Sequence, residues 1–285
     1  MSAAGTAPGI LRAAAVGLAA GTVAWAAMRL RRTADQRIPR LVRTNHAGDP
    51  VSLVEGPVAA GGLMVAAACV PGAVPRTAAL TAVGAAGVLG AVDDFAERGA
   101  SKGLRGHLGA LRRGRVTTGA LKVIGIPVAS VAAAALLRTD ATTPAGRAVD
   151  AVLAGGVIAG TANLLNLLDL RPGRALKAGL VIAGVQTLVD GRRATAASGA
   201  VGAGVVGVTA VLLPDDLRGA TMLGDAGANA LGAALGLRAA LTASRPRLAC
   251  ELAGLAALTL ASERVSFTRV IERTPGLREF DAMGR

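Results

Sequence analysis

Aromatic residues are almost missing from this chain of 285 residues, which has no tyrosine, one tryptophan and three phenylalanines. Charged residues make up only 17% of the sequence, whereas 52% of the residues are hydrophobic. Soluble domains differ from this composition on every count, so a soluble enzyme is excluded. The two cysteines, Cys69 and Cys250, both lie inside apolar runs. We therefore expect them to be small buried hydrophobic residues rather than a disulfide or a metal site.

Acidic residues are also scarce relative to basic ones, which gives a net charge of +13. Such a charge can indicate nucleic-acid binding. Here, however, the lysines and arginines are spread through short segments between apolar runs. That distribution is typical of a membrane protein, where basic residues set the orientation and meet anionic headgroups. We expect a membrane and no nucleic acid as partner.

Apolar runs recur along the whole length and predict one all-α domain over residues 1–285, a polytopic integral membrane bundle. Several runs are shorter than the roughly 17–25 residues that a spanning helix needs, so we expect about nine transmembrane helices, with eight to ten as the range. Gly232 and Gly236, four residues apart, favour close helix packing in lipid. The nine runs are Ile10–Met28, Pro57–Val70, Thr77–Val92, Thr118–Leu137, Ala148–Leu168, Ala178–Val189, Ser198–Leu213, Ala228–Thr242 and Leu248–Ser262.

The distribution of basic residues predicts how the chain is oriented. If the amino terminus lies outside, the cytosolic segments hold 21 lysines and arginines and the outer segments hold eight. Because positive charge favours the cytosolic side, we expect a multi-pass protein of the plasma (inner) membrane with its amino terminus outside and its carboxy terminus in the cytosol. Residues 263–285 read as a short basic amphipathic tail on the membrane surface.

The most informative stretch is the end of the third run, where Val92 is followed by Asp93, Asp94 and, three residues later, Glu97. Carboxylates at membrane depth are costly and mark interfaces or wet functional cavities. Two adjacent acids repel each other unless a cation lies between them, and such pairs suit Mg²⁺ together with phosphate oxygens. The alternative is an ordinary helix end with solvated acids.

Three further polar clusters fall on the same predicted cytosolic side. Each also has a purely structural interpretation: the asparagines could link helices, Asp225 could cap a helix, and Lys122 could reach the headgroups. Acids from three helix ends on one face, with asparagines and a lysine, nevertheless indicate a site for Mg²⁺ and a diphosphate. The residues concerned are Lys102, Arg105, His107 and Lys122 after the aspartates; Asn163, Asn166 and Asp169, followed by Arg171, Arg174 and Lys177; Asp225 and Asn229; and Asn45 and His46 before Pro57.

The order of these motifs resembles the polyprenyl-phosphate phospho-N-acetylhexosamine transferase superfamily. That superfamily includes the phospho-N-acetylmuramoyl-pentapeptide transferase of peptidoglycan synthesis and the undecaprenyl-phosphate N-acetylglucosamine-1-phosphate transferases. Asp93-Asp94 is similar to its Asp-Asp motif, and Lys122 matches its downstream lysine. Its Asn-x-x-Asn-x-x-Asp motif matches Asn163, Asn166 and Asp169, and residues 223–228 resemble its Met-Gly-Asp-x-Gly-Ser motif. The likeness spans about residues 40 to 240.

The resemblance implies a Mg²⁺-dependent phosphoglycosyl transferase that moves a phospho-sugar from a UDP-sugar onto a polyprenyl phosphate and releases UMP, in cell-wall or other envelope glycan synthesis. Asp93, Asp94 and Asp225 would be catalytic, with Asp225 and Asp94 at the metal. The diphosphate and the rest of the donor would be bound by Lys122, Asn163, Asn166, Asp169, Arg171 and Arg174.

Several departures from the family pattern leave a second interpretation open. Leu170-Arg171-Pro172-Gly173 stands where the family has Gly-Leu-Asp-Gly, so one acid is missing, and no histidine occurs after His107. Few aromatic residues remain to stack on a uracil; Phe95 is one. The alternative is an inactive paralogue that binds polyprenyl phosphate or scaffolds envelope enzymes. A transporter would place acids in repeated halves, and we find no repeat. The sugar, the lipid length and the oligomeric state, a homodimer included, stay open.

Overall fold

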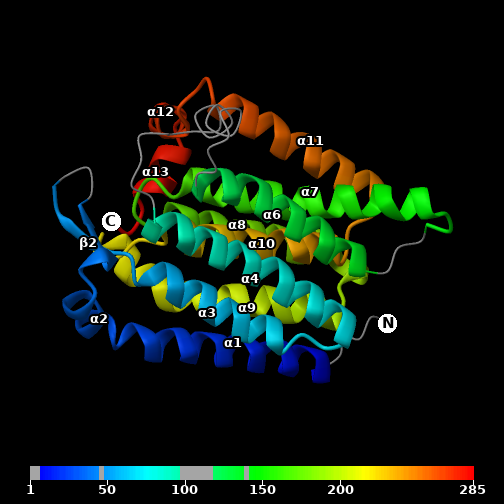
Figure 1. Cartoon of the computed structure of the whole chain (residues 1–285), viewed down its shortest axis with the longest axis horizontal. Helices are drawn as coiled ribbons and strands as arrows, with labels where there is room; N and C mark the ends of the chain where they lie inside the picture. The colour runs from blue at the N-terminus through cyan, green and yellow to red at the C-terminus, as the bar shows by residue number, and fades with distance from the viewer. Residues whose placement is uncertain (1–6, 45–47, 97–117, 138–140) are drawn as a thin grey trace.

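The apolar runs fold into long helices, because a chain in lipid must satisfy its backbone hydrogen bonds internally. A computed structural model of the protein describes residues 7–44, 48–96, 118–137 and 141–285. The long helices of that part of the chain run along the long axis (Figure 1). The long ones are α1 (Ala7–Met28), α3 (Glu55–Ala68), α4 (Ala73–Ala96), α6 (Thr118–Leu136), α7 (Pro144–Leu168), α8 (Arg174–Asp190), α9 (Ala196–Leu217), α10 (Gly224–Ala240) and α11 (Arg245–Ser262). The short ones are α2 (Arg31–Arg37), η2 (Pro39–Leu41), η3 (Gly191–Arg193), α12 (Phe267–Arg273) and α13 (Leu277–Ala282).

The expectation of an α-helical membrane protein is confirmed in its coarser form. Five helices of the described chain, α1, α4, α6, α7 and α9, are long and apolar enough to cross a membrane. The helix α3 is apolar but has only 14 residues. Each of the nine predicted runs falls on a helix, although α8 begins four residues before the predicted run, at Arg174, and α10 begins at Gly224 instead of Ala228.

One small sheet, which the sequence did not predict, interrupts the all-α architecture. Strands β1 (Val42–Thr44) and β2 (Pro50–Ser52) pair antiparallel, with Val42 opposite Ser52 and Thr44 opposite Pro50. Ser52 also pairs with the connection between α9 and α10, because its carbonyl oxygen accepts the N–H of Met222 at 3.0 Å. The hairpin therefore holds the start of α10 at one end of the bundle, which we call the hairpin end.

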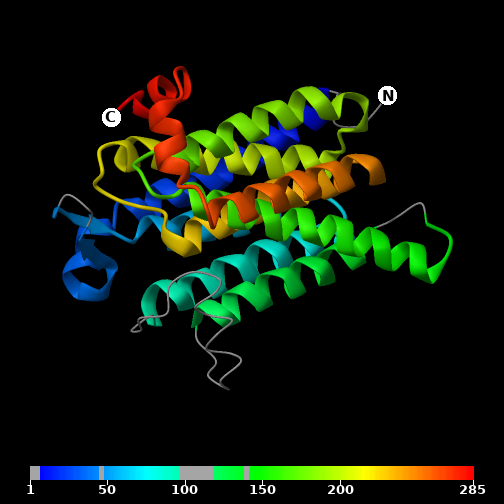
Figure 2. The same cartoon turned by 90° about the horizontal axis from the view of Figure 1, so that it is seen from above.

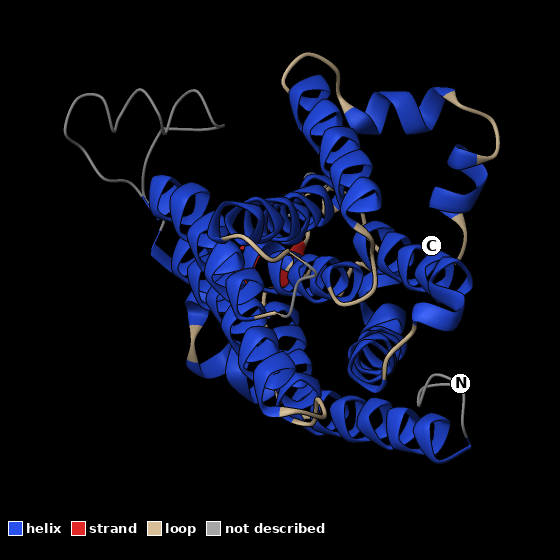
Figure 3. Cartoon of the chain, turned by 90° about the vertical axis from the view of Figure 1, so that its right-hand side faces the viewer, coloured by secondary structure: helices blue, strands red, loops and turns tan. Residues whose placement is uncertain are grey.

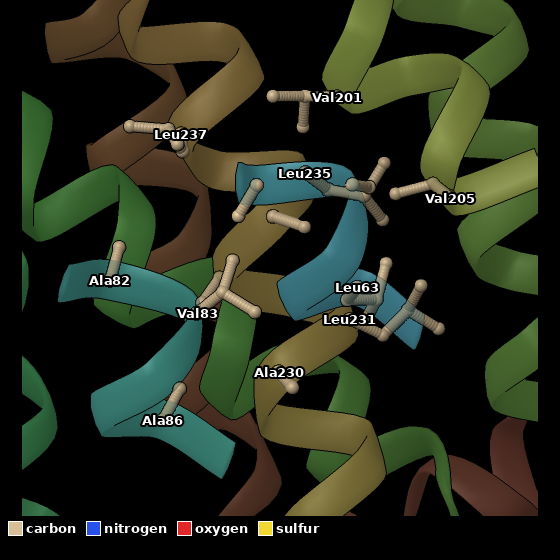
Figure 4. Close-up of a cluster of buried hydrophobic side chains, with 14 of the residues drawn as sticks. Leu63, Ala82, Val83, Ala86, Val201, Val205, Ala230, Leu231, Leu235 and Leu237 are labelled. Carbon is tan, nitrogen blue, oxygen red and sulfur yellow. The ribbon is translucent and has the colours of Figure 1, made fainter. Parts of the chain in front are cut away.

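The helix α10 forms the centre of the bundle. It packs against α3, α4, α7 and α9, and buried leucines and alanines from several helices gather around it (Figure 4). Gly232 and Gly236 allow α7 to approach closely, since a Cβ at Gly232 would lie 2.4 Å from the carbonyl oxygen of Thr161 and one at Gly236 would lie 2.5 Å from the Cα of Ile158. The packing role predicted for these two glycines is confirmed.

The carboxy-terminal helices lie at the hairpin end, as the view from above shows (Figure 2). The view along the bundle shows that they lie to one side of the long helices (Figure 3). The segment predicted as an amphipathic tail forms the two short helices α12 and α13. Both cysteines are free, as expected, but Cys69 and Cys250 are exposed on the outer face of the bundle. The expectation that they are buried is therefore wrong. An apolar run in lipid has outward-facing positions that need no burial.

Candidate active site

Asp94 connects the end of α4 to the start of α10. Its Oδ1 accepts the backbone N–H of Asp225 at 3.0 Å, and its Oδ2 accepts that of Ala226 at 2.9 Å. The first N–H groups of a helix have no partner inside it, and a carboxylate there also meets the positive end of the helix dipole. The helices can come this close because Gly90 lacks a side chain: a Cβ there would lie 2.3 Å from the carbonyl oxygen of Asp225. Asp94 thus fixes the position of Asp225.

Lys122, in the first turns of α6, lies between two of the predicted catalytic acids. Its Nζ is 2.7 Å from Oδ2 of Asp93 and 2.5 Å from Oδ2 of Asp225. Only 15% of the lysine side chain and 6% of the Asp93 side chain are exposed. A cation buried to this degree needs its partners, because an isolated buried charge is strongly unfavourable. Three helices, α4, α6 and α10, therefore meet through one lysine and two aspartates.

The arrangement leaves negative charge in excess. With Asp93, Asp94 and Asp225 ionised, Lys122 neutralises one of three carboxylates. Arg43 of β1 approaches from outside, but its Nη2 donates to the backbone carbonyl oxygen of Asp94, not to a carboxylate. The Oδ1 atom of Asp93 is buried and has no hydrogen-bond partner in the described chain. Such a cluster attracts a further cation.

A second group of acids, from other helices, lies at the same end. Glu55, at the start of α3, is completely buried, and neither of its carboxylate oxygens has a partner among the described residues. Asp216, in the last turn of α9, is 2% exposed. Asp169 follows the last residue of α7; burial, and then the nearby charge of Asp216, raise the pKa of its carboxyl well above the usual range. The hairpin end therefore gathers acids from five helix ends.

The two asparagines of the predicted Asn-x-x-Asn-x-x-Asp motif have different surroundings. The side-chain amide of Asn163 donates to Oγ1 of Thr259 on α11 at 3.0 Å, so this side chain links two helices. Asn166 is half-buried, and its side chain makes no hydrogen bond to a described residue. Roles for both in binding a donor stay predictions.

The basic residues that follow this motif are bound by the carboxy-terminal segment. Arg174 donates from Nε and Nη2 to the two carboxylate oxygens of Asp281, at 2.7 and 2.9 Å. Nζ of Lys177 donates to the backbone carbonyl oxygens of Phe280 and Asp281, at 2.9 and 2.6 Å. Arg171 pairs with Glu272 on the exposed surface. These partners hold α12 and α13 against the start of α8.

The environment of Asp281 shows how firmly the carboxy-terminal helix α13 is held. Burial raises the pKa of the Asp281 carboxyl, but the hydrogen bonds and positive charges of Arg174 and Arg285 outweigh that effect and lower the pKa to about 2. The carboxylate is therefore ionised at any physiological pH. Arg174 therefore pairs with Asp281 of the carboxy-terminal segment and not with the acids around Lys122.

Several predicted site residues lie outside the described residues. These are Glu97, Lys102, Arg105, His107, Asn45 and His46. Of the others, the structure brings together Asp93, Asp94, Lys122 and Asp225, and places Asp169 at the same end.

The sequence reasoning missed Glu55 and Asp216. A signal for Asp216 was present, since the apolar run of α9 ends in Asp215-Asp216 just as the run of α4 ends in Asp93-Asp94. Glu55 stands two residues before the apolar run that begins at Pro57. A single acid at such a position is read as solvated, and only the hairpin packing shows that it is buried.

The donor set fits a Mg²⁺ ion that shares its ligands with substrate. Among the residues that the structure describes, no three His, Cys, Asp or Glu side chains form a complete metal site. Mg²⁺ at phosphate-transfer sites, however, is bound by one or two carboxylates, with phosphate oxygens and water as the remaining ligands. The unpartnered Oδ1 of Asp93 and the partly exposed carboxylate of Asp225 suit that role. Asp94 as a ligand stays a prediction, since a carboxylate with two N–H partners keeps further lone pairs.

Comparisons with known proteins do not add a family to this description. A scan of the chain against models of protein families finds no match, and a search of curated proteins finds none either.

Proposed function

We propose that the protein transfers a phospho-sugar from a UDP-sugar to a polyprenyl phosphate at the hairpin end of the bundle, in the synthesis of an envelope glycan. The observation that carries the proposal is the contact of Lys122 with both Asp93 and Asp225, next to Asp94. Carboxylates for a divalent cation and a lysine for phosphate oxygens are the groups that a phosphoryl transfer needs.

The reaction needs acids that hold a cation, and it does not need a general base. A phosphate oxygen of the lipid forms a bond to the sugar-linked phosphorus of the donor, and the bond from that phosphorus to the bridging oxygen breaks, so that UMP leaves. Because the attacking phosphate is already an anion, no proton needs to be removed first. The chain has to align the two substrates and offset their negative charge.

Each residue has a defined task in this scheme. Asp225 and Asp93 would hold Mg²⁺, which when bound would neutralise charge on the diphosphate. Lys122 exchanges one carboxylate contact for a diphosphate oxygen, and Asp94 keeps Asp225 in place through the first turn of α10. In the same scheme, Asp169 and Asn166 would contact the donor.

We also propose that all nine long helices take part in the membrane domain. The 17 residues of α10 extend about 26 Å at 1.5 Å per residue, close to the roughly 30 Å hydrocarbon thickness. The hairpin end then faces the cytosol, where UDP-sugars are available, and the amino terminus lies outside. The excess of basic residues in the segments at this end supports that orientation.

The test uses purified full-length protein with undecaprenyl phosphate, Mg²⁺ and a panel of UDP-sugars, and it measures UMP release. We expect release with at least one donor, dependent on both lipid and metal, and loss of about a hundredfold or more in Asp93→Asn and Asp225→Asn. Asp150→Asn is the matched control, because Asp150 pairs with Arg245 at the opposite end of the bundle. Equal rates in all three variants would rule out the proposed centre.

A second candidate function is an inactive paralogue that binds the lipid phosphate or scaffolds envelope enzymes. It is favoured by the ion pair between Arg174 and Asp281. Arg174 directly follows Leu170-Arg171-Pro172-Gly173, the segment where the resembled family has an acid. This candidate predicts that the protein retains polyprenyl phosphate but releases no UMP with any donor.

A further inference from the structure

A long groove crosses the bundle between α1 and α8, with α9 as its floor. It encloses a cavity of about 1020 Å³. Along α1 its wall extends from Ala14 to Trp25, which corresponds to about 17 Å of helix. Glycines, alanines and valines line most of it, so the groove is apolar and narrow. Figure 1 shows α1 and α9 side by side along this length.

Among the described residues that line this apolar groove, one is charged. Arg238 extends from α10, and only 5% of it is exposed. Its Nη1 donates to the carbonyl oxygen of Ala183 at 2.9 Å and its Nη2 to Oγ1 of Thr187 at 2.8 Å, whereas its Nε–H has no partner in the described chain. Gly202 on α9 makes room for the guanidinium, since a Cβ there would lie 2.7 Å from Nη1. A buried arginine with a free donor at membrane depth indicates a functional site.

The end of the groove near Arg238 carries an excess of positive charge. Asp190 accepts a hydrogen bond from Arg247 at 2.9 Å and lies 3.7 Å from Arg238. Arg247 also pairs with Glu251 at 2.7 Å. The turn η3, next to the groove, adds the exposed Arg192 and Arg193. Four arginines and two acids therefore lie at or beside this end of the groove, although Arg193 lines the neighbouring cavity. Such an excess of positive charge attracts anionic headgroups.

From this geometry we propose that the groove binds one anionic phospholipid, with its phosphate near the guanidinium group of Arg238 and an acyl chain along α1 and α9. The charge excess selects an anionic headgroup, and the apolar wall of about 17 Å suits an acyl chain. The site is separate from the proposed active site. Asp225 and Arg238 are 13 residues apart on α10, or about 20 Å along the helix axis.

A second copy of the chain fits this groove less well. Leu18 and Trp25 on its rim are largely exposed and could contact another protomer. A two-fold dimer through this face, however, would bring the same basic ends together, because symmetric interfaces pair each patch with itself. Lipid is therefore the occupant that matches both the apolar wall and the charge.

The test fills the groove without disturbing the fold. A Cβ at Gly184 meets nothing within 4 Å although the residue lines the groove, so Gly184→Leu adds volume only to the lipid site. Gly254→Leu is the matched control, because Gly254 on α11 also has nothing within 4 Å and lies outside the groove. Arg238→Gln tests headgroup selectivity, with Asp190 still paired to Arg247.

The measurement is native mass spectrometry of the full-length protein in detergent, titrated with phosphatidylglycerol and phosphatidylcholine. We expect the wild type and Gly254→Leu to retain phosphatidylglycerol about tenfold better, Gly184→Leu to lose the bound lipid, and Arg238→Gln to lose the preference. Equal retention of the two lipids by the wild type would overturn the proposal. So would undiminished phosphatidylglycerol binding by Gly184→Leu, or a dimer that this substitution dissociates. Because no sugar donor is present, a failure here leaves the transferase proposal untouched.

Discussion

Replacing Lys122 with methionine tests the core of the candidate site. The substitution keeps an unbranched side chain of similar length but removes the cation between Asp93 and Asp225. Breaking a buried ion pair from one side costs about 3–5 kcal/mol, because the remaining charge is left uncompensated. Here two carboxylates lose their partner, so we expect the free energy of unfolding to fall by about 4 kcal/mol.

The magnitude can be checked by a double-mutant cycle, with unfolding followed by circular dichroism in mixed micelles of increasing SDS content. Adding Asp93→Asn to Lys122→Met removes one of the uncompensated charges, so we expect the double variant to recover about 1–3 kcal/mol relative to the sum of the single effects. Lys122→Arg, which keeps the charge, should lose far less. A Lys122→Met protein within about 0.5 kcal/mol of the wild type would refute the reasoning, because it would mean that the lysine and the acids are solvated.

Three further changes test other parts of the account. Asp94→Ala leaves two N–H groups of α10 without partners and should cost about 2 kcal/mol in the same unfolding assay, with Asp94→Asn near half of that. Gly232→Leu should cost about 3 kcal/mol or more, because α7 leaves no room, whereas Gly254→Leu should be neutral. The pKa of Asp281 is lowered to about 2, so the docking of α13 should be at full strength above about pH 4 and should weaken as the pH falls toward 2. Limited proteolysis of the tail by pepsin across this pH range measures the loss of docking. Release at pH 4 that is as strong as release at pH 2 would contradict the last prediction.

The helix α10 shows which features of the fold can be predicted from the sequence. Its apolar residues and the spacing of Gly232 and Gly236 predicted a closely packed helix, and the structure confirms it. Hydropathy alone did not place its start, which lies at Gly224 because Asp94 and the hairpin hold the first turn. The hairpin itself was missed, because three-residue strands carry too few residues to show an alternating pattern.

In the candidate site, too, some features can be predicted from the sequence and others depend on the tertiary fold. Asp93, Asp94, Lys122 and Asp225 could be chosen from the sequence because charged residues stand out at the ends of apolar runs. The contacts between these residues could not be predicted from the sequence, because Lys122 and Asp225 are 103 residues apart in the chain. The tail was expected on the membrane surface; its contacts with Arg174 and Lys177 depend on the tertiary fold, and its place on a membrane stays a prediction.

The most direct test of the proposed transfer follows the donor phosphorus. Purified protein is incubated with undecaprenyl phosphate, Mg²⁺ and a UDP-sugar labelled with ³²P in either the sugar-linked or the uridine-linked phosphate, and the lipid is then extracted. The account predicts label in the lipid from the sugar-linked phosphate only, and none with Asp225→Asn. Label from the uridine-linked phosphate, or transfer that persists in Asp225→Asn, would contradict it.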